Sequence, residues 1–360
     1  MEIKDFFRLS DGQLKHYAKL DEKYRLMRKD PEHCEPMFII DTPAVLPPWE
    51  ERLADPEVMM KAELEQLRGH LELEDDRAMT VRVQFGTAQI AAAFGCELFV
   101  PPNSLPAARS HILKNAEDIY EMPLPSLSAG WYGKVEQFSE FYRRNLPEGV
   151  HMQLPDVQSP FNTAHLIRGN DILLDFYDNP DALCALLDKV TDYMIALIPH
   201  LNAMTGRQDG WFYDWGVLWK GAARISNCSM HMISPAMYEE YVLPRDIRLM
   251  QEIGGGRIHY CGTSGDVIDC FFKNENITGL DYDLQYHDLW SLCERAPKNT
   301  MLMVNQWGCG AQERENMERL LERLERDGWP DKRNIIIHAE AASREEGKTL
   351  LRRLRATVKG

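Results

Sequence analysis

Short apolar runs alternate with longer amphipathic segments along most of the chain after residue 78. The runs are rich in β-branched and aromatic residues, which is typical of buried strands. A further apolar run at residues 37–42 is predicted to supply another strand or to belong to an N-terminal extension. The predicted strands after residue 78 are 79–85, 149–157, 210–215, 257–262, 277–283, 299–306 and 334–340.

Helices are predicted between these runs, because apolar residues recur there with helical spacing. The clearest helix, residues 179–204, opens with Asn179 as a capping residue and Pro180 in its first turn. Residues 234–254 open in the same way with serine and proline and end at a glycine. The other predicted helices are 1–30, 50–75 and 313–328.

The alternation of strands and helices is typical of a parallel sheet. With this many units in one unbroken stretch, a closed barrel fits better than an open sheet. We therefore predict an α/β protein with a (β/α)8 TIM barrel over residues 79–360. Residues 1–78 are predicted to form an N-terminal helical extension that belongs to the same domain.

The charge of the chain narrows the classes of partner. Its 360 residues carry a formal net charge of −15, which disfavours nucleic acid and anionic membrane surfaces, because both require clustered Lys and Arg. The first 30 residues lack the apolar core of a signal peptide, and no run reaches the ~20 apolar residues of a membrane span. We expect a cytoplasmic protein, in which the eight cysteines stay reduced.

Polar residues stand where several predicted strands end. In a parallel barrel the carboxyl ends of the strands meet at one mouth, where the chemistry of such barrels is located. Each of these residues taken alone is equally well a loop or capping residue, but a barrel brings them together. They are Asp156, Asp214, His259, Cys261, Asp281, Asp283, Asn305, His338 and Glu340.

The stretch His259-Tyr260-Cys261-Gly262 is a candidate half of a metal site. Residues i and i+2 of a strand point the same way, so the imidazole and the thiol can reach one ion. These groups are preferred donors for zinc, and glycine permits a tight turn beneath the ion. The alternative is an ordinary core histidine beside a buried cysteine.

Several longer stretches, taken in order, resemble the uroporphyrinogen decarboxylase superfamily. The resemblance spans roughly residues 50–355 and implies a (β/α)8 fold. The stretches are "FGTAQIAAAFGCELF" (85–99), "LPDVQSPFNTAHLIRGNDILLDFYDNPDAL" (154–183), "ISPAMYEEYVLP" (233–244), "IHYCG" (258–262) and "LDYD" (280–283).

The resemblance is to one branch of that superfamily. The decarboxylases carry an arginine-rich N-terminal segment that grips porphyrinogen carboxylates, whereas this chain reads "MFIIDTPAVLPPWEERL" there. The zinc-dependent methyltransferases that act with corrinoid proteins carry the histidine–cysteine pair seen at His259 and Cys261. The resemblance thus implies zinc, a corrinoid supplied by a partner protein, and methyl transfer to or from a small methoxy, methylamine or thiol compound.

The third zinc ligand in that branch is a cysteine of the last strand, where this chain reads "NIIIHAEAAS". We expect His338 to replace it, with Glu340 or Cys309 as alternatives. Two histidines and one cysteine donate less charge than two cysteines, so the metal would be a stronger Lewis acid. That ligand set favours demethylation of a methoxy or methylamine compound, with cob(I)alamin as the acceptor.

An aromatic cluster at residues 211–219 is a candidate substrate wall. Trp211 and Trp215 are predicted to share one face and to receive an arene, a methylammonium group or a corrin. The alternative is a packed barrel rim. Asp214 and Glu340 are predicted catalytic groups. The other predicted substrate-binding residues are Gln84, Asn162, Asp281 and Asn305.

Two other functions compete with corrinoid-linked methyl transfer. The first is decarboxylation of a tetrapyrrole-like acid, which the acidic charge and the missing arginines disfavour. The second is a non-catalytic barrel that binds a corrinoid or a metal, which the missing last-strand cysteine favours. The sequence leaves the oligomeric state open, with a homodimer as one candidate.

Overall fold

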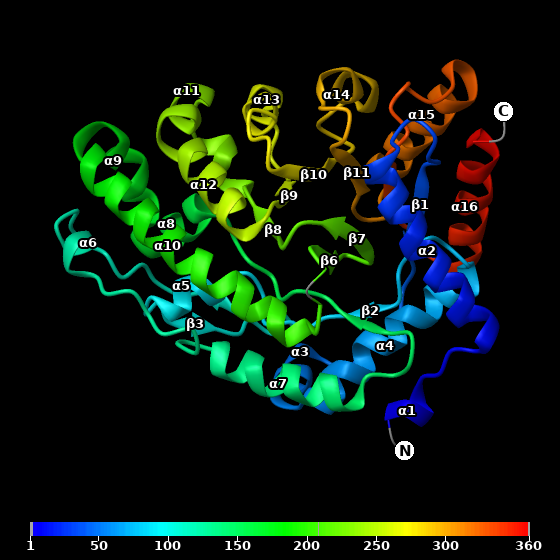
Figure 1. Ribbon diagram of the computed structural model, residues 1–360, viewed down its shortest axis with the longest axis horizontal. Helices are drawn as coiled ribbons and strands as arrows, with labels where there is room; N and C mark the ends of the chain where they lie inside the picture. Colours follow the sequence, from blue (N-terminus) through cyan, green and yellow to red (C-terminus); the bar gives the residue numbers. More distant parts are fainter. Residues whose placement is uncertain (1–2, 208, 359–360) are drawn as a thin grey trace.

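Eight parallel strands form the barrel in the computed structural model, which describes residues 3–207 and 209–358 (Figure 1). Six of them form a continuous sheet in the order β1-β12-β11-β10-β9-β8. Their bounds are β1 Met37–Asp41, β8 Ala223–Ser226, β9 Gly256–Tyr260, β10 Ile277–Asp283, β11 Met301–Gln306 and β12 Ile335–Glu340. The short strands β2 (Thr80–Val81) and β5 (His151–Met152) pair in parallel with each other.

Backbone contacts close the ring on both sides of β2 and β5. A bridge joins Gln158 to Ser226 of β8, and the amide of Asp76 donates to the carbonyl of Phe38 in β1 at 2.8 Å. The predicted (β/α)8 fold is therefore confirmed. The predicted boundary at residue 79 is not where the barrel begins, because β1 pairs with β12 and is itself a barrel strand.

Helices surround the strands (Figure 1). Those before β8 are α1 Ile3–Phe6, α2 Asp11–Lys29, α3 Trp49–Ala54, α4 Pro56–Leu73, α5 Gln89–Ala93, α6 Asp118–Glu121, α7 Tyr132–Asn145, α8 Pro160–Arg168, α9 Ile172–Asp178 and α10 Pro180–Thr205. Those after it are α11 Pro235–Met237, α12 Leu243–Ile253, α13 Gly265–Phe271, α14 Leu289–Arg295, α15 Ala311–Asp327 and α16 Arg344–Val358.

The remaining elements are short. Two 3-10 turns, η1 Gly169–Asp171 and η2 Cys228–Met232, follow α8 and β8, and a π turn, η3 Tyr238–Val242, lies between α11 and α12. The strands β3 (Leu98–Phe99) and β4 (Ala107–Ala108) form a small antiparallel ribbon. No helix within residues 3–207 and 209–358 combines the length and the apolar character that crossing a membrane requires.

The strands are buried because helices cover one face and side chains fill the barrel on the other. Every residue of β10 and β11 is buried, and Ile335, Ile336 and Ile337 of β12 are fully buried. Burial on both faces explains why these strands appear in the sequence as continuous apolar runs.

The aromatic segment at residues 210–215 is not a barrel strand, contrary to the prediction. It forms β6 (Trp211–Asp214), which pairs antiparallel with β7 (Val217–Lys220), and the barrel strand is the next one, β8. The hairpin packs between α2 and the strands β9 and β10. A Cβ added at Gly279 of β10 would lie 2.3 Å from the Trp219 ring, so this close packing requires glycine.

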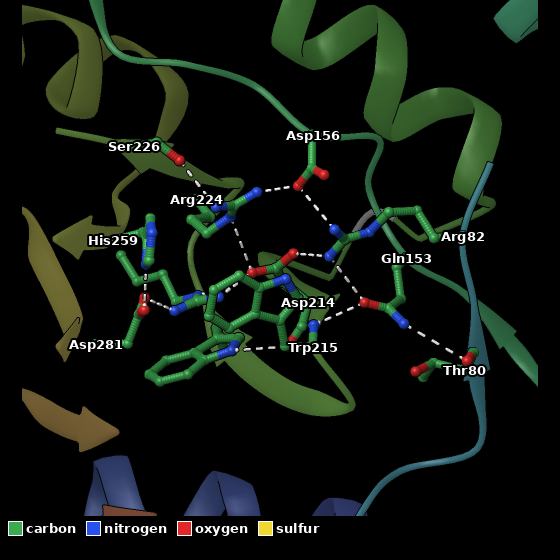
Figure 2. Close-up of polar contacts among 12 residues, drawn as sticks. Thr80, Arg82, Gln153, Asp156, Asp214, Trp215, Arg224, Ser226, His259 and Asp281 are labelled. Carbon is green, nitrogen blue, oxygen red and sulfur yellow. Dashed lines mark hydrogen bonds and ion pairs between the residues drawn. The ribbon is translucent and has the colours of Figure 1, made fainter. Parts of the chain in front are cut away.

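A buried ion network fixes the tip of the hairpin inside the barrel (Figure 2). The carboxylate of Asp214 pairs with Arg82, which follows β2, and with Arg224 of β8 and Arg257 of β9. All four residues are at most 4% exposed. Charged groups removed from water are tolerated only when they are paired and hydrogen-bonded. Asp214 meets this requirement for all three arginines, because it is their shared counterion.

Replacing Asp214 with alanine should lower the free energy of unfolding by about 3–5 kcal/mol, because three buried guanidinium groups lose their shared counterion. Urea unfolding followed by circular dichroism measures the change. Asp188→Ala is the matched control, since Asp188 pairs with Arg245 at the surface and is 46% exposed; its cost should stay below about 1 kcal/mol. Equal costs for the two variants would contradict the central role of Asp214.

Candidate metal centre

Cys228, His259 and Cys261 converge at the ends of two neighbouring strands. Each offers one ligand atom, and the three atoms lie within 4.8 Å of one another. His259 belongs to β9 and Cys261 follows that strand directly, while Cys228 is the first residue of η2, just after β8. Ser226 of β8 pairs in register with His259, so the local sheet geometry brings the two strand ends together.

The neighbouring strand β10 orients the imidazole of His259. Asp281 is the register partner of His259, and its carboxylate is hydrogen-bonded to Nδ1 of the imidazole (Figure 2). Asp281 is fully buried, and Nδ2 of Asn305 donates to it at 3.0 Å. A carboxylate on one ring nitrogen fixes the tautomer in which the other nitrogen, Nε2, can bind a metal.

Charge and burial favour the metal-binding forms of these side chains. Burial, together with Arg224 and Arg257, holds the pKa of His259 well below its usual value, so the imidazole is neutral. A hydrogen bond from Cys228 lowers the pKa of Cys261, and the same hydrogen bond raises the pKa of Cys228. The hydrogen bond therefore makes Cys261 the more readily ionised of the two thiols, and a bound cation would favour the thiolate form of both.

His338, predicted as the third ligand, is not part of this group. Its Nδ1 lies 3.1 Å from Oδ1 of Asn305 and its Nε2 lies 3.0 Å from Oδ2 of Asp41. Both ring nitrogens are thus occupied by neighbours on β11 and β1. The end of β12 is also three strands away from β9, so the structure places Cys228, and not His338, beside His259 and Cys261.

The two alternative ligands also lie elsewhere. Glu340 accepts a hydrogen bond from the amide of Gly308 at 2.9 Å and so fixes the loop after β11. Cys309 lies in that same loop, and its pKa is raised by burial and by the nearby charge of Glu340. Neither residue belongs to the group of converging ligand atoms.

Asp41 links His338 to a second buried histidine. Its Oδ1 lies 3.1 Å from Nε2 of His70, whose Nδ1 lies 2.7 Å from Asp75. Burial alone would raise the pKa of Asp41, but His338, His70 and Arg77 hold it well below the usual value. This side of the mouth therefore carries a fixed carboxylate between two imidazoles, separate from the cysteines.

The two tryptophans predicted to share a wall lie apart. The Trp215 ring is 5.0 Å from the His259 ring and 5.2 Å from that of Trp307. Trp211 instead lies beneath Arg25 of α2, at 4.8 Å. Trp215 has a φ of +49° at the hairpin turn, so the alternation of a strand does not extend to it. Trp307, which the sequence analysis did not select, takes the place beside Trp215.

Two of the remaining predicted residues, Asn162 and Asp214, support the structure around the converging ligands. Asn162 accepts a hydrogen bond from the amide of Ser229 at 2.9 Å and donates to Gln158 at 2.8 Å, so it holds the Cys228 loop. Asp214, predicted to be catalytic, is enclosed by arginines. Gln84 keeps Oε1 buried and without a partner among the described residues.

Sequence reasoning missed Cys228 because it missed β8. That strand has only four residues, Ala223–Ser226, and it follows a hairpin whose first arm has the pattern of a barrel strand. The available signal was the short run "ARIS" followed by "NCSMH", a second strand end with a cysteine and a histidine close together.

Cys261 should be the most rapidly alkylated of the cysteines in metal-free protein. It is exposed, and its lowered pKa gives more of the reactive thiolate at a given pH. Iodoacetamide labelling at neutral pH, read by peptide mass spectrometry, measures the rates. Cys309, with a raised pKa, is the control within the same protein. Cys228→Ala should slow labelling of Cys261, and an unchanged rate would show that the two thiols do not interact.

Comparison with solved structures agrees with the fold. A methyltransferase from Methanosarcina mazei superposes with a TM-score of 0.67 over 94% of this chain and 98% of its own, at 17% sequence identity. This likeness is one of fold: the barrel that carries the three converging residues has the same architecture as that solved protein.

Comparison with known sequences gives the family. The methylcobamide:CoM methyltransferase MtbA of Methanosarcina acetivorans is 25% identical over 74% of this chain and 76% of its own length. The methylated-thiol–coenzyme M methyltransferase of Methanosarcina mazei is 24% identical over 56% of this chain and 52% of its own. These relatives confirm the predicted likeness to the methyltransferase branch. The family model for uroporphyrinogen decarboxylase (URO-D) matches residues 47–288, and the chain therefore belongs to the uroporphyrinogen decarboxylase family.

Proposed function

We propose that the protein is a zinc-dependent enzyme that transfers a methyl group between a small substrate and a corrinoid carried by a partner protein. The observation that carries the proposal is the convergence of Cys228, His259 and Cys261 at the barrel mouth. The relatives named for methyl transfer between methylcobamide and coenzyme M support the same reaction class.

The donor set fits zinc. Two thiolates and one imidazole are preferred zinc ligands, and three protein ligands leave a fourth position for a substrate. The hydrogen bond that Nδ1–H of His259 donates to the carboxylate of Asp281 is the outer support that such histidine ligands usually have. The exposure of Cys261 gives a substrate access to the group.

The ligand set changes the expected substrate. The ligand set expected from the sequence, two histidines and one cysteine, favoured a methoxy or methylamine substrate. The group that converges in the structure instead holds two cysteines and one histidine. Bound zinc would supply the positive charge that lets a thiol lose its proton near neutral pH, and a set with two thiolates leaves the substrate sulfur a good nucleophile. We therefore favour a small thiol, in agreement with the thiol-named relative.

The reaction balances without a further reagent. The S–H bond of the thiol breaks, an S–CH3 bond forms, and the methyl–cobalt bond breaks with its electron pair remaining on cobalt. The proton goes to water. The protein's part is to hold the reacting sulfur in place. The ring of Trp215 beside His259, together with the ring of Trp307 beside Trp215, provides an apolar wall there.

The charges inside the barrel argue against decarboxylation of a tetrapyrrole-like acid. Such a substrate needs free arginines for its carboxylates, whereas Arg82, Arg224 and Arg257 are each paired with aspartate. A barrel without catalytic function is also disfavoured, because the ligand group is complete although the last strand lacks a cysteine.

Zinc content tests the ligand assignment. Purified wild-type protein should contain one equivalent of zinc per chain, and Cys228→Ser and Cys261→Ser should lose it after brief dialysis against a chelator. His338→Ala and Cys309→Ser should retain it, because their side chains lie outside the group. Retention by Cys228→Ser together with loss by His338→Ala would reverse the assignment.

Methyl transfer tests the reaction. With free methylcobalamin standing in for the corrinoid protein, small thiols should be methylated, and cob(I)alamin formation gives the absorbance signal under anaerobic conditions. Chelation should abolish the rate and added zinc should restore it. The reverse reaction, in which cob(I)alamin takes the methyl group of methoxy or methylamine compounds, should be undetectable. Turnover of those compounds but not of thiols would contradict a thiol substrate and would favour a methyl donor with an oxygen or nitrogen leaving group.

A further inference from the structure

A buried polar group stands directly behind Cys228. The preceding residue, Asn227, is fully buried, and its Nδ2 donates to Oδ2 of Asp246 on α12 at 2.9 Å. The hydroxyl of Tyr238 donates to the same oxygen at 2.7 Å. Asp246 and Tyr238 are also fully buried. The helix α12 is therefore linked to the metal-binding loop through a carboxylate that no solvent reaches.

The same asparagine ties the two ligand-bearing strand ends together. Its backbone amide donates to the carbonyl of His259 at 2.8 Å. On the other side of Cys228, the amide of Ser229 donates to Asn162 at 2.9 Å. Cys228 thus lies between two residues that are each held by a buried side chain, and the backbone on either side of the thiol has little freedom.

The π turn at the start of α12 is part of this arrangement. Tyr238 and Asp246 are eight residues apart, a spacing that an α-helix with 3.6 residues per turn does not align. The π turn Tyr238–Val242 inserts one extra residue, so the two side chains lie as residues seven apart would in a regular helix. Such turns are rare and often occur at functional sites.

The cluster does not maximise stability. Oδ1 of Asn227 and Oδ1 of Asp246 are both buried and have no hydrogen-bond partner among the described residues. A buried unpaired polar atom costs about 1–3 kcal/mol. Two such unpaired atoms lower the stability of the fold. The cluster is therefore better explained by the position that it imposes on the Cys228 loop than by a contribution to folding.

We propose that Asn227, Asp246 and Tyr238 are positioning residues that hold Cys228 at the distance and angle required for metal binding. The inference rests on the proposed function, since it assumes that Cys228 is a ligand. It assigns to α12 the role of locating the one cysteine that does not share a strand with the other two ligands.

Zinc affinity is the first measurement. Asn227→Ala should weaken zinc binding roughly 10- to 100-fold, the usual effect of losing an outer-sphere partner, measured by competition with a chromophoric chelator. Asn334→Ala is the matched control. Asn334 is also fully buried, with Oδ1 unpaired among the described residues and Nδ2 donating to the carbonyl of Lys298 at 3.2 Å, but it lies directly before β12. The Asn334→Ala variant should lose similar thermal stability without loss of zinc affinity.

The thiolate count is the second measurement and does not depend on turnover. In cobalt(II)-substituted protein, the sulfur-to-cobalt charge-transfer band should indicate two thiolates in the wild type and one in Cys228→Ser. Asn227→Ala should show a weakened or shifted band. A wild-type band of one thiolate would overturn the proposed ligand set itself, whereas two thiolates with an unaltered band and affinity in Asn227→Ala would overturn only the positioning role.

A conservative variant separates positioning from folding. Burial raises the pKa of Asp246 to about 6, so a neutral side chain of the same shape is suited to the site. Asp246→Asn can still accept through its amide oxygen from Tyr238 and from Nδ2 of Asn227, as Oδ2 of Asp246 does, and it should keep zinc affinity within about threefold of the wild type. Asp246→Leu should weaken it as Asn227→Ala does. Equal affinities for the leucine variant and the wild type, or equal losses for the leucine and asparagine variants, would falsify the positioning role.

Discussion

The interior of this barrel depends on the ion pairs that the carboxylate of Asp214 makes. This carboxylate reaches in from the tip of a hairpin and is the common partner of Arg82, Arg224 and Arg257. Arg257 in turn pairs with Asp281, and Asp281 holds Nδ1 of His259. A continuous path of ion pairs therefore leads from the hairpin to the imidazole of His259, and the orientation of that ring is set by Asp281 on the neighbouring strand β10.

The charges of this path are balanced, and the balance matters for the chemistry. Three arginines face three aspartates, namely Asp156, Asp214 and Asp281. No guanidinium of the network remains to attract a polycarboxylate, and the network adds no net positive charge beside the cysteines. The interior arginines of this barrel are thus occupied by aspartates and do not form a binding site for substrate carboxylates.

The sequence allowed the barrel to be predicted because strands buried on both faces leave continuous apolar runs, as in β10, β11 and β12. It did not distinguish β6 from a barrel strand, since an arm of a buried hairpin has the same local pattern. The four-residue β8 was consequently overlooked, and Cys228 with it. The sequence predicted the nearness of His259 and Cys261 because two donors at one strand end need no knowledge of the rest of the fold. That Cys228 joins them depended on which strands are neighbours. The prediction that Trp211 and Trp215 share a face was wrong because Trp215 lies at a left-handed turn, where the alternation of a strand ends.

All three converging ligand residues come from the ends of β8 and β9, which are adjacent in the sheet. The strands on the other side of the mouth, β11, β12 and β1, contribute Asn305, His338 and Asp41, which bind one another. The mouth therefore has two sectors that meet at Asn305, because the amide of Asn305 also donates to Asp281. Substitutions at His338 or Asp41 can change the shape and polarity that a bound compound meets while Asn305 keeps its hydrogen bond to Asp281. A single scaffold can then diversify its choice of compound while the half that carries the converging cysteines and histidine is inherited unchanged.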